Sequence, residues 1–261
     1  MNIFNAIILG LIQGLTEFLP VSSSGHLEIA KSIFGLETES SFYFTVAVHG
    51  ATVMSIIVVF WNEIIKLLKG GLQFKLNDEN KYNLKIIVSM IPVVFVGFFF
   101  KDTVEAMFTG NLVFVGTMLI VTSVILFAGH FLSMKKSGKG IGYIEAFTIG
   151  IAQAVAVIPG ISRSGATIST GLMLGVKKDE VTKFSFLMVL IPIIGANIVE
   201  LLSGDFVKGE ENEAVLIAGF LSAFFSGFLA CKWMITLVRK SKMIWFSVYC
   251  LLAGIAAIIA G

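Results

Sequence analysis

Two polar stretches interrupt an otherwise apolar chain, and both carry side chains capable of chemistry. The first stretch, residues 13–26, contains a carboxylate, a run of hydroxyls and an imidazole, namely Glu17, Ser22, Ser23, Ser24 and His26. The second stretch, residues 159–167, contains a guanidinium among hydroxyls, namely Ser162, Arg163, Ser164 and Thr167. Together these groups predict acid–base or nucleophilic chemistry on an anion.

The serines of both stretches precede short helical segments, so we expect at least one serine in each to be an N-cap. Capping is compatible with function, because a helix N-terminus presents free N–H groups and a partial positive charge to an anion. Arg163 adds a planar fork of donors, which favours phosphate or carboxylate. Thr167 lies one helical turn beyond Ser164 and offers a further donor.

His26 follows Ser23 by three residues, a spacing that lets it reach the serine loop or a bound anion as acid or base. The alternative is a buried histidine with a purely structural hydrogen bond. His49 and His130 lack such neighbours, and we interpret both as structural.

Composition places the chain in a membrane. Its 261 residues are 56% hydrophobic and 14% charged, and the mean hydropathy is +0.93, outside the range of soluble proteins. A carboxylate at bilayer depth costs about 2.5–3.5 kcal/mol. We therefore expect Glu17, which shares a helix face with Gln13, to be paired or to face water. The alternative for Glu17 is a structural hydrogen bond to a neighbouring helix.

Hydrophobic patterning predicts an all-α polytopic protein of one integral-membrane domain, residues 1–261. Pro20 breaks the first apolar helix, and a second short helix ends near Gly35, so both pieces form a re-entrant hairpin. Six full spans are expected at 42–61, 86–100, 112–134, 184–203, 214–234 and 243–260, with basic loops at 62–85, 134–142, 176–183 and 232–243.

The opening pattern repeats at an offset of 140 residues. Matches at this offset are Gly10/Gly150, Gln13/Gln153, Ser22/Ser162, Ser24/Ser164, Gly25/Gly165 and Gly35/Gly175. Each half, about 1–140 and about 141–261, would then hold one broken hairpin and three spans. Because three is odd, the second half enters the membrane from the opposite side, which predicts two inverted-topology repeats.

Charge placement predicts the orientation. Fifteen of the nineteen Lys and Arg residues fall in the four basic loops. By the positive-inside rule this face is cytoplasmic, so both termini lie outside. Topology also accounts for these lysines without a nucleic-acid partner.

The two motifs resemble those of the undecaprenyl-diphosphatase family of the bacitracin-resistance type. The family signatures are a Glu/Gln-x-x-x-Glu segment leading to Ser-Ser-x-Gly-His, here residues 13–26, and Pro-Gly-x-Ser-Arg-Ser-x-x-Thr, here residues 159–167. The similarity extends over the whole chain in the order and spacing of spans. The first acidic position is Gln13, which leaves one carboxylate where a two-carboxylate metal site would need two.

The resemblance implies a hydrolase of the bacterial plasma membrane whose site opens to the outer face. Such a hydrolase removes the terminal phosphate of undecaprenyl diphosphate, recycles the cell-wall carrier lipid and confers bacitracin resistance. The resemblance also implies a divalent cation, Mg²⁺ or Ca²⁺, with Glu17 aiding metal or water. Ser23 would be the nucleophile or a positioning hydroxyl, His26 its acid–base partner, and Arg163 the phosphoryl clamp. The remaining substrate-binding residues would be Gln13, Ser22, Ser24, Ser162, Ser164 and Thr167.

Two other classes compete with the enzyme. Inverted repeats with broken helices are typical of transporters, so a transporter or flippase of a lipid phosphate is the alternative. A nucleophile, an imidazole and an arginine together favour the enzyme, since transport needs no acid–base group. A channel fits poorly, because the polar residues converge on a pocket. The sequence leaves open which serine attacks, whether a phosphoserine forms, and the oligomeric state.

Overall fold

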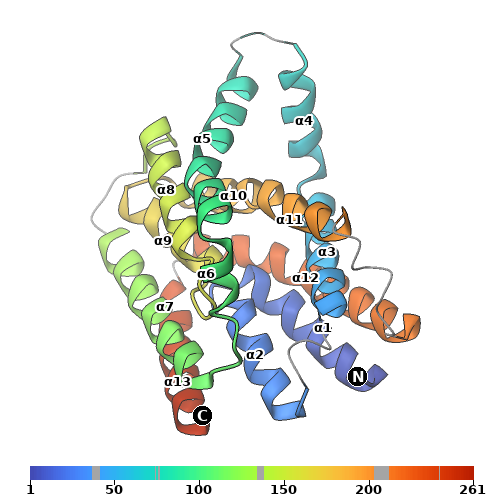
Figure 1. Cartoon of the computed structure of the whole chain (residues 1–261). Coiled ribbons are helices and arrows are strands. Elements are labelled where there is room, and N and C mark those ends of the chain that lie inside the picture. Colours follow the sequence, from blue (N-terminus) through green and yellow to red (C-terminus); the bar gives the residue numbers. More distant parts are fainter. Residues whose placement is uncertain (37–41, 74, 76, 134–137, 203–211, 241) are drawn as a thin grey trace.

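The fold is known from a computed structural model that describes residues 1–36, 42–73, 75, 77–133, 138–202, 212–240 and 242–261. Throughout this described part the chain is helical, apart from turns and an isolated β-bridge between Lys139 and Val176 (Figure 1). The predicted all-α class is therefore confirmed.

The N-terminal hairpin forms as its proline and glycine dictate. Helix α1 (Ile3–Phe18) ends because Leu19 precedes Pro20 and adopts an extended conformation, with φ −70° and ψ 145°. Helix α2 (Ser23–Phe34) begins after Ser22, whose side chain accepts a hydrogen bond from the Gly25 N–H. Gly35 ends α2 in the left-handed region, at φ 62°.

The second hairpin repeats this local chemistry. Helix α8 (Tyr143–Val155) is followed by a turn and then by α9 (Arg163–Met173). The Ser162 side chain accepts from the Gly165 N–H, as Ser22 does from Gly25 140 positions earlier. Gly175 has a positive φ of 83°, like Gly35. Two capped short helices therefore begin at equivalent places in the sequence.

The remaining helices are longer on average and surround the hairpins. Their bounds are α3 (Phe42–Val59), α4 (Trp61–Gly71), α5 (Asp78–Phe99), α6 (Lys101–Glu105), α7 (Leu112–Ser133), α10 (Lys178–Met188), α11 (Leu190–Leu202), α12 (Glu213–Arg239) and α13 (Met243–Ala260). Among the described residues, five helical stretches are long and apolar enough to cross a membrane, or six when the bent pair α3–α4 counts as one span.

Two expectations about these segments were wrong. The stretch 62–85 was expected to be a basic loop, but most of it is helix, because α4 extends to Gly71 and Asn77 caps the start of α5. The span expected at 184–203 begins earlier, at Lys178, and is interrupted at Val189 between α10 and α11. The expected loop at 134–137 lies outside the described residues.

Glycines allow two pairs of helices, α1 with α12 and α8 with α5, to pack with their backbones in close contact. A Cβ atom on Gly10 of α1 would lie 2.5 Å from the Gly219 carbonyl oxygen of α12, and one on Gly150 of α8 would lie 2.3 Å from the Ser89 carbonyl oxygen of α5. Each hairpin helix therefore packs tightly against a helix from the other half of the chain.

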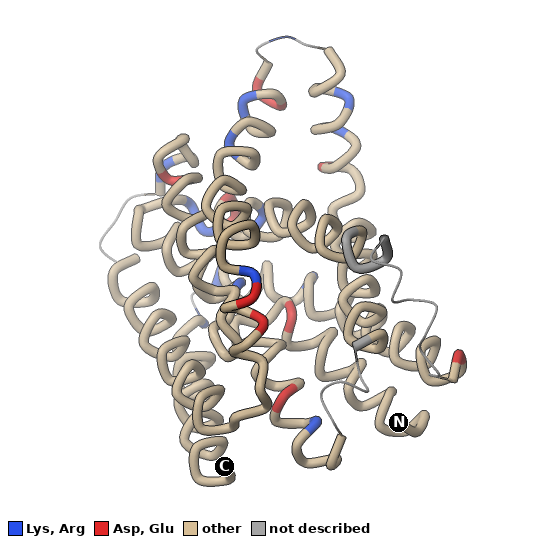
Figure 2. Tube along the Cα trace, viewed as in Figure 1, with Lys and Arg blue, Asp and Glu red and all other residues tan. Residues whose placement is uncertain are grey.

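The exterior matches a membrane environment. Large apolar side chains such as Phe98, Ile144 and Ile259 are about four-fifths exposed, as expected for lipid-facing positions. Most basic residues gather toward the end of the molecule formed by α4 and the start of α5 (Figure 2). Both chain termini lie at the opposite end (Figure 1).

Candidate active site

Glu17 is the centre of a polar cluster that joins the two hairpins. One carboxylate oxygen, Oε2, accepts hydrogen bonds from Ser23 Oγ at 2.7 Å and from Gln13 Nε2 at 2.9 Å. The other oxygen, Oε1, accepts from Arg163 Nη2 in an ion pair. The buried charge is thereby compensated by one cation and two neutral donors, as a carboxylate at membrane depth requires.

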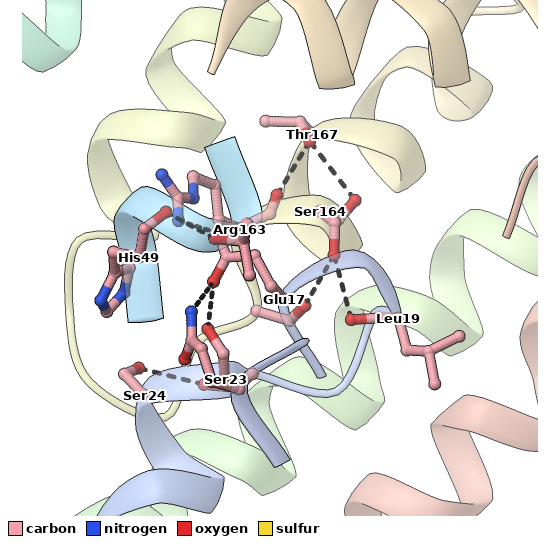
Figure 3. Close-up of polar contacts among 12 residues, drawn as sticks. Glu17, Leu19, Ser23, Ser24, His49, Arg163, Ser164 and Thr167 are labelled. Atoms are coloured by element: carbon pink, nitrogen blue, oxygen red, sulfur yellow. Dashed lines mark hydrogen bonds and ion pairs between the residues drawn. The ribbon is translucent and has the colours of Figure 1, made fainter. Parts of the chain in front are cut away.

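Each member of this cluster is positioned by a helix end (Figure 3). Gln13 and Glu17 share a face of α1 in its last two turns, whereas Ser23 and Arg163 are the first residues of α2 and α9. The Glu17 side chain is 5% exposed and that of Arg163 is 27% exposed. The guanidinium therefore remains partly accessible, while the carboxylate behind it is buried.

Further contacts hold the hairpins together around the cluster. Ser24 Oγ accepts from the Gly160 N–H at 3.4 Å, and Ser164 Oγ donates to the Leu19 carbonyl at 3.2 Å. A Cβ on Gly25 would lie 3.2 Å from the Gly160 Cα, so the backbones of the two serine loops lie close together. The structure thus brings together the two motifs that the sequence places far apart.

Ser22 and Ser162 are buried caps in the same region. Ser22 has φ 71°, a left-handed conformation uncommon for residues other than glycine. Ser162 also donates its N–H to Thr122 Oγ1 at 2.9 Å. Capping satisfies one N–H of each helix and leaves other first-turn N–H groups without intrahelical partners. Both helix N-termini therefore keep the anion-binding character expected from the sequence.

The Thr167 side chain is buried within the protein, whereas Arg163 lines the cavity described below. Its hydroxyl donates to the Arg163 carbonyl at 2.8 Å and is 2.6 Å from Ser185 Oγ, and the residue is 1% exposed. Thr167 and Ser164 both bond to protein groups, and neither lines the large cavity described below. Their hydroxyls therefore support the start of α9. That they bind substrate stays a prediction.

His26 is directed away from the cluster. Its Nδ1 is 2.8 Å from the Ser22 carbonyl oxygen, and its Nε2 is 2.7 Å from the hydroxyl of Tyr249 on α13, against which the ring stacks. His26 does not line the cavity. The structure therefore does not bring His26 to Ser23, and the predicted acid–base role is not supported by a contact between these two side chains.

A cavity of about 1090 Å³ opens beside the cluster. Its polar part is lined by Glu17, Ser23 and Arg163, together with both serine caps. Its apolar part is lined by side chains from α5 and α11, among them Val93, Phe98, Ile191 and Ile193, and by Phe108 in the turn after α6. The arrangement suits a molecule with an anionic end and a long hydrocarbon.

Several polar residues that the sequence did not single out as site residues also line this cavity, among them His49, Gln153 and Lys31. Gln153 is 1% exposed, and neither its Oε1 nor its Nε2 has a hydrogen-bond partner. A buried unpaired amide costs about 1–3 kcal/mol, so this side chain is suited to contact a ligand. The match of Gln153 with Gln13 at the repeat offset is the feature of the sequence that could have identified Gln153 as a site residue.

The expected Mg²⁺ or Ca²⁺ stays a prediction. No group of three or more His, Cys, Asp or Glu residues suited to a metal occurs in the described part of the chain. Hard divalent cations take oxygen ligands and are often held by one or two protein oxygens plus substrate phosphates. Gln153 Oε1 is an oxygen without a partner in the cavity wall, whereas both Glu17 oxygens already accept hydrogen bonds from Gln13, Ser23 and Arg163, so Glu17 would have to exchange one of these contacts for a cation.

Comparison with known proteins agrees with these features. The family of the bacitracin resistance protein BacA matches residues 6–256. An undecaprenyl-diphosphatase of Christiangramia forsetii is 50% identical over 99% of this chain and 98% of its own length. One from Bacteroides thetaiotaomicron is 50% identical over 99% of each chain, and one from Thermosipho africanus is 43% identical over 98% of this chain and 100% of its own. The chain belongs to the bacitracin resistance protein BacA family.

Proposed function

We propose that this chain hydrolyses undecaprenyl diphosphate in the bacterial plasma membrane, releasing phosphate and returning undecaprenyl phosphate as a cell-wall carrier lipid. Similar chains carry the name undecaprenyl-diphosphatase. The observation that carries the proposal is the Arg163–Glu17–Ser23 cluster at the polar end of a cavity whose other walls are apolar. Such recycling is the basis on which the chain would confer bacitracin resistance.

The cluster supplies the groups that phosphoryl transfer needs. Ser23 Oγ donates to Glu17 Oε2 at 2.7 Å, so the carboxylate is placed to take the serine proton as Ser23 attacks phosphorus. Arg163 would bind the phosphoryl oxygens and stabilise charge that develops in the transition state. The N-termini of α2 and α9 add N–H donors to the same anion.

Other members of the predicted site would act through these three residues. Gln13 holds Glu17 from behind, and Ser22, Ser24, Ser162, Ser164 and Thr167 hold the two loops in register. A divalent cation, when bound by Glu17 and Gln153, would neutralise diphosphate oxygens. His26 is bonded to the Ser22 carbonyl and to Tyr249, and we assign it the positioning of the serine loop.

The proposed setting is two inverted repeats. The contact of α7 with α13 supports it, because a Cβ on Gly116 would meet the Gly254 carbonyl oxygen at 2.6 Å and one on Gly254 would meet that of Gly116 at 2.6 Å. Ile258 lies beside Gly116 and Ile120 beside Gly254 in the same reciprocal manner. Reciprocal contacts are the signature of a two-fold relation, and 254 minus 116 is 138, close to the hairpin offset of 140.

The proposed orientation has the basic end in the cytoplasm and both termini outside. Its support is the gathering of Lys and Arg at the α4–α5 end, away from the termini (Figures 1 and 2). Much of the cavity is lined by α2, by α11 and by the later part of α5, Met90 to Phe98, and Glu105 of α6 also reaches it. A cavity opening on that side would receive a lipid diphosphate from the outer leaflet.

Phosphate release in detergent tests the proposal and separates it from a transporter or flippase. With no membrane present, purified protein should release phosphate from a polyprenyl diphosphate in the presence of Mg²⁺ or Ca²⁺. Arg163→Ala and Ser23→Ala should abolish release while the protein stays folded. Full release by both variants would contradict the site, and no release by the wild type with either cation would favour the transporter.

A further inference from the structure

His49 is a cavity residue with a fixed ring tautomer. It lies on α3, and its Nδ1 is 2.8 Å from the carbonyl oxygen of Thr45 one turn earlier. Because a carbonyl only accepts, Nδ1 must carry the proton of the neutral ring, and Nε2 keeps the lone pair. No described residue forms a hydrogen bond with Nε2, and the side chain is partly exposed in the cavity wall.

The other two histidines are not available in this way. Both ring nitrogens of His26 are engaged, by Ser22 and by Tyr249, outside the cavity. His130 on α7 contacts Phe131 and does not line the cavity. Of the three histidines in the chain, His49 alone presents a basic nitrogen to the space where a substrate would bind.

His49 shares the cavity wall with the reacting groups. Figure 3 shows it on α3, on the same side of the cluster as the Arg163 guanidinium. The charged side chains that share the cavity wall with it are Glu17 from α1, Glu28 and Lys31 from α2, Glu105 from α6, and Arg163 from α9. A base in this wall can reach a molecule held against Arg163 without displacing the Ser23–Glu17 hydrogen bond.

We propose that His49 is the base that takes a proton from the attacking water in the hydrolysis, an inference that rests on the phosphatase function proposed above. Glu17 is already committed to the Ser23 hydroxyl and would hold the serine proton after phosphoryl transfer. Water then attacks the phosphoserine: its oxygen bonds to phosphorus, one proton moves to His49 Nε2, and the Ser23–phosphorus bond breaks. Glu17 returns its proton to Ser23, and His49 releases its own to solvent with the phosphate.

The first test is the kinetics of His49→Gln, which keeps an amide for hydrogen bonding but has no titratable nitrogen. Loss of a general base lowers kcat by about 10²–10⁴-fold, so kcat should fall within that range while KM changes little. His130→Gln, outside the cavity, is the matched control and should behave as wild type.

Chemical rescue guards against a merely structural effect. In His49→Ala, imidazole added to the assay should restore part of the lost rate, because it can occupy the vacated space and accept the proton. The same addition should not restore Ser23→Ala. A His49→Gln enzyme with wild-type kcat, or a His49→Ala enzyme that imidazole leaves unaffected, would overturn the assignment. Failure of the wild type to release phosphate would instead overturn the phosphatase function.

Discussion

Arg163 and Glu17, 146 positions apart in the sequence, form an ion pair that joins the second hairpin to the first. The carboxylate belongs to the end of α1 and the guanidinium to the first residue of α9. The proposed site needs both hairpins, since Glu17 and Ser23 come from the first and Arg163 from the second. The pair therefore couples the packing of the two hairpins to the chemistry at their junction.

Loss of Arg163 should destabilise the protein as well as inactivate it. Arg163→Ala leaves Glu17, 5% exposed, without its cation, and we expect a loss of about 1–3 kcal/mol, less than for a fully buried pair because Arg163 is partly solvated. Adding Glu17→Gln removes the unpaired charge and should recover most of this loss. Thermal or denaturant unfolding in detergent measures both changes.

A surface pair provides the control for that experiment. Asp78 and Lys81 are 3.5 Å apart on α5, with side chains 96% and 51% exposed. Lys81→Ala should leave the unfolding midpoint within error, because exposed pairs contribute little. If Arg163→Ala also left the unfolding midpoint unchanged, the ion pair would not stabilise the junction of the hairpins.

Among the serines, Ser23 should carry the reaction. Its hydroxyl bonds to Glu17, whereas Ser24 Oγ makes only contacts of 3.3–3.4 Å to Ser22 Oγ and the Gly160 N–H. We expect Ser23→Ala to lower kcat by at least 10³-fold and Ser24→Ala to lower it far less. Ser133→Ala, at the end of α7, is a control expected to match wild type. A larger loss from Ser24→Ala than from Ser23→Ala would reassign the nucleophile.

The α7–α13 contact should tolerate no added side chain. In Gly116→Leu, the new atoms would collide with the α13 backbone, since even a Cβ lies 2.6 Å from the Gly254 carbonyl oxygen. The melting temperature in detergent should fall by several degrees. Gly97→Ala on α5 is the matched control, because nothing lies within 4 Å of its Cβ position, and it should not lower the melting temperature. Equal behaviour of the two variants would mean that α7 and α13 do not pack in this way.

Cysteine labelling tests the proposed orientation. Lys66 and Lys101 are exposed, at 74% and 63%, and the proposal puts them on opposite sides of the membrane. A membrane-impermeant maleimide should modify Lys101→Cys in intact spheroplasts and Lys66→Cys only after permeabilisation. The natural cysteines, Cys231 and Cys250, are fully buried and should give little background. The reverse pattern would invert the topology.

The sequence predicts the broken helices and the cluster well, because both depend on local chemistry. Pro20, Gly35 and the serine caps end or begin helices through contacts with residues a few positions away. The repeat at an offset of 140 residues then predicts the second loop. The cost of a charge at membrane depth predicts that Glu17 is paired or faces water, but it does not name the partner. That the partner is Arg163 was not predicted from the sequence, because Arg163 was assigned to the phosphate.

The histidines could not be assigned in this way, because their directions depend on distant helices. His26 accompanies Ser23 in the sequence, but its ring packs against Tyr249, 223 residues away. His49 has apolar neighbours along the chain and enters the cavity only through the placement of α3. Similarly, the lysines of residues 62–85 indicated a loop, whereas tertiary packing of α4 against α5 supports helix there.

The most direct test of the central claim, that the two hairpins form one phosphatase site, is a double-mutant cycle on phosphate release. Wild type, Glu17→Gln, Arg163→Ala and the double variant are compared in detergent with a polyprenyl diphosphate and Mg²⁺. Residues that act as one unit are strongly non-additive, so the double variant should be no slower than the slower single variant. If the double variant instead lost activity by the product of the two single fold-losses, the two residues would act independently, which would contradict a shared site.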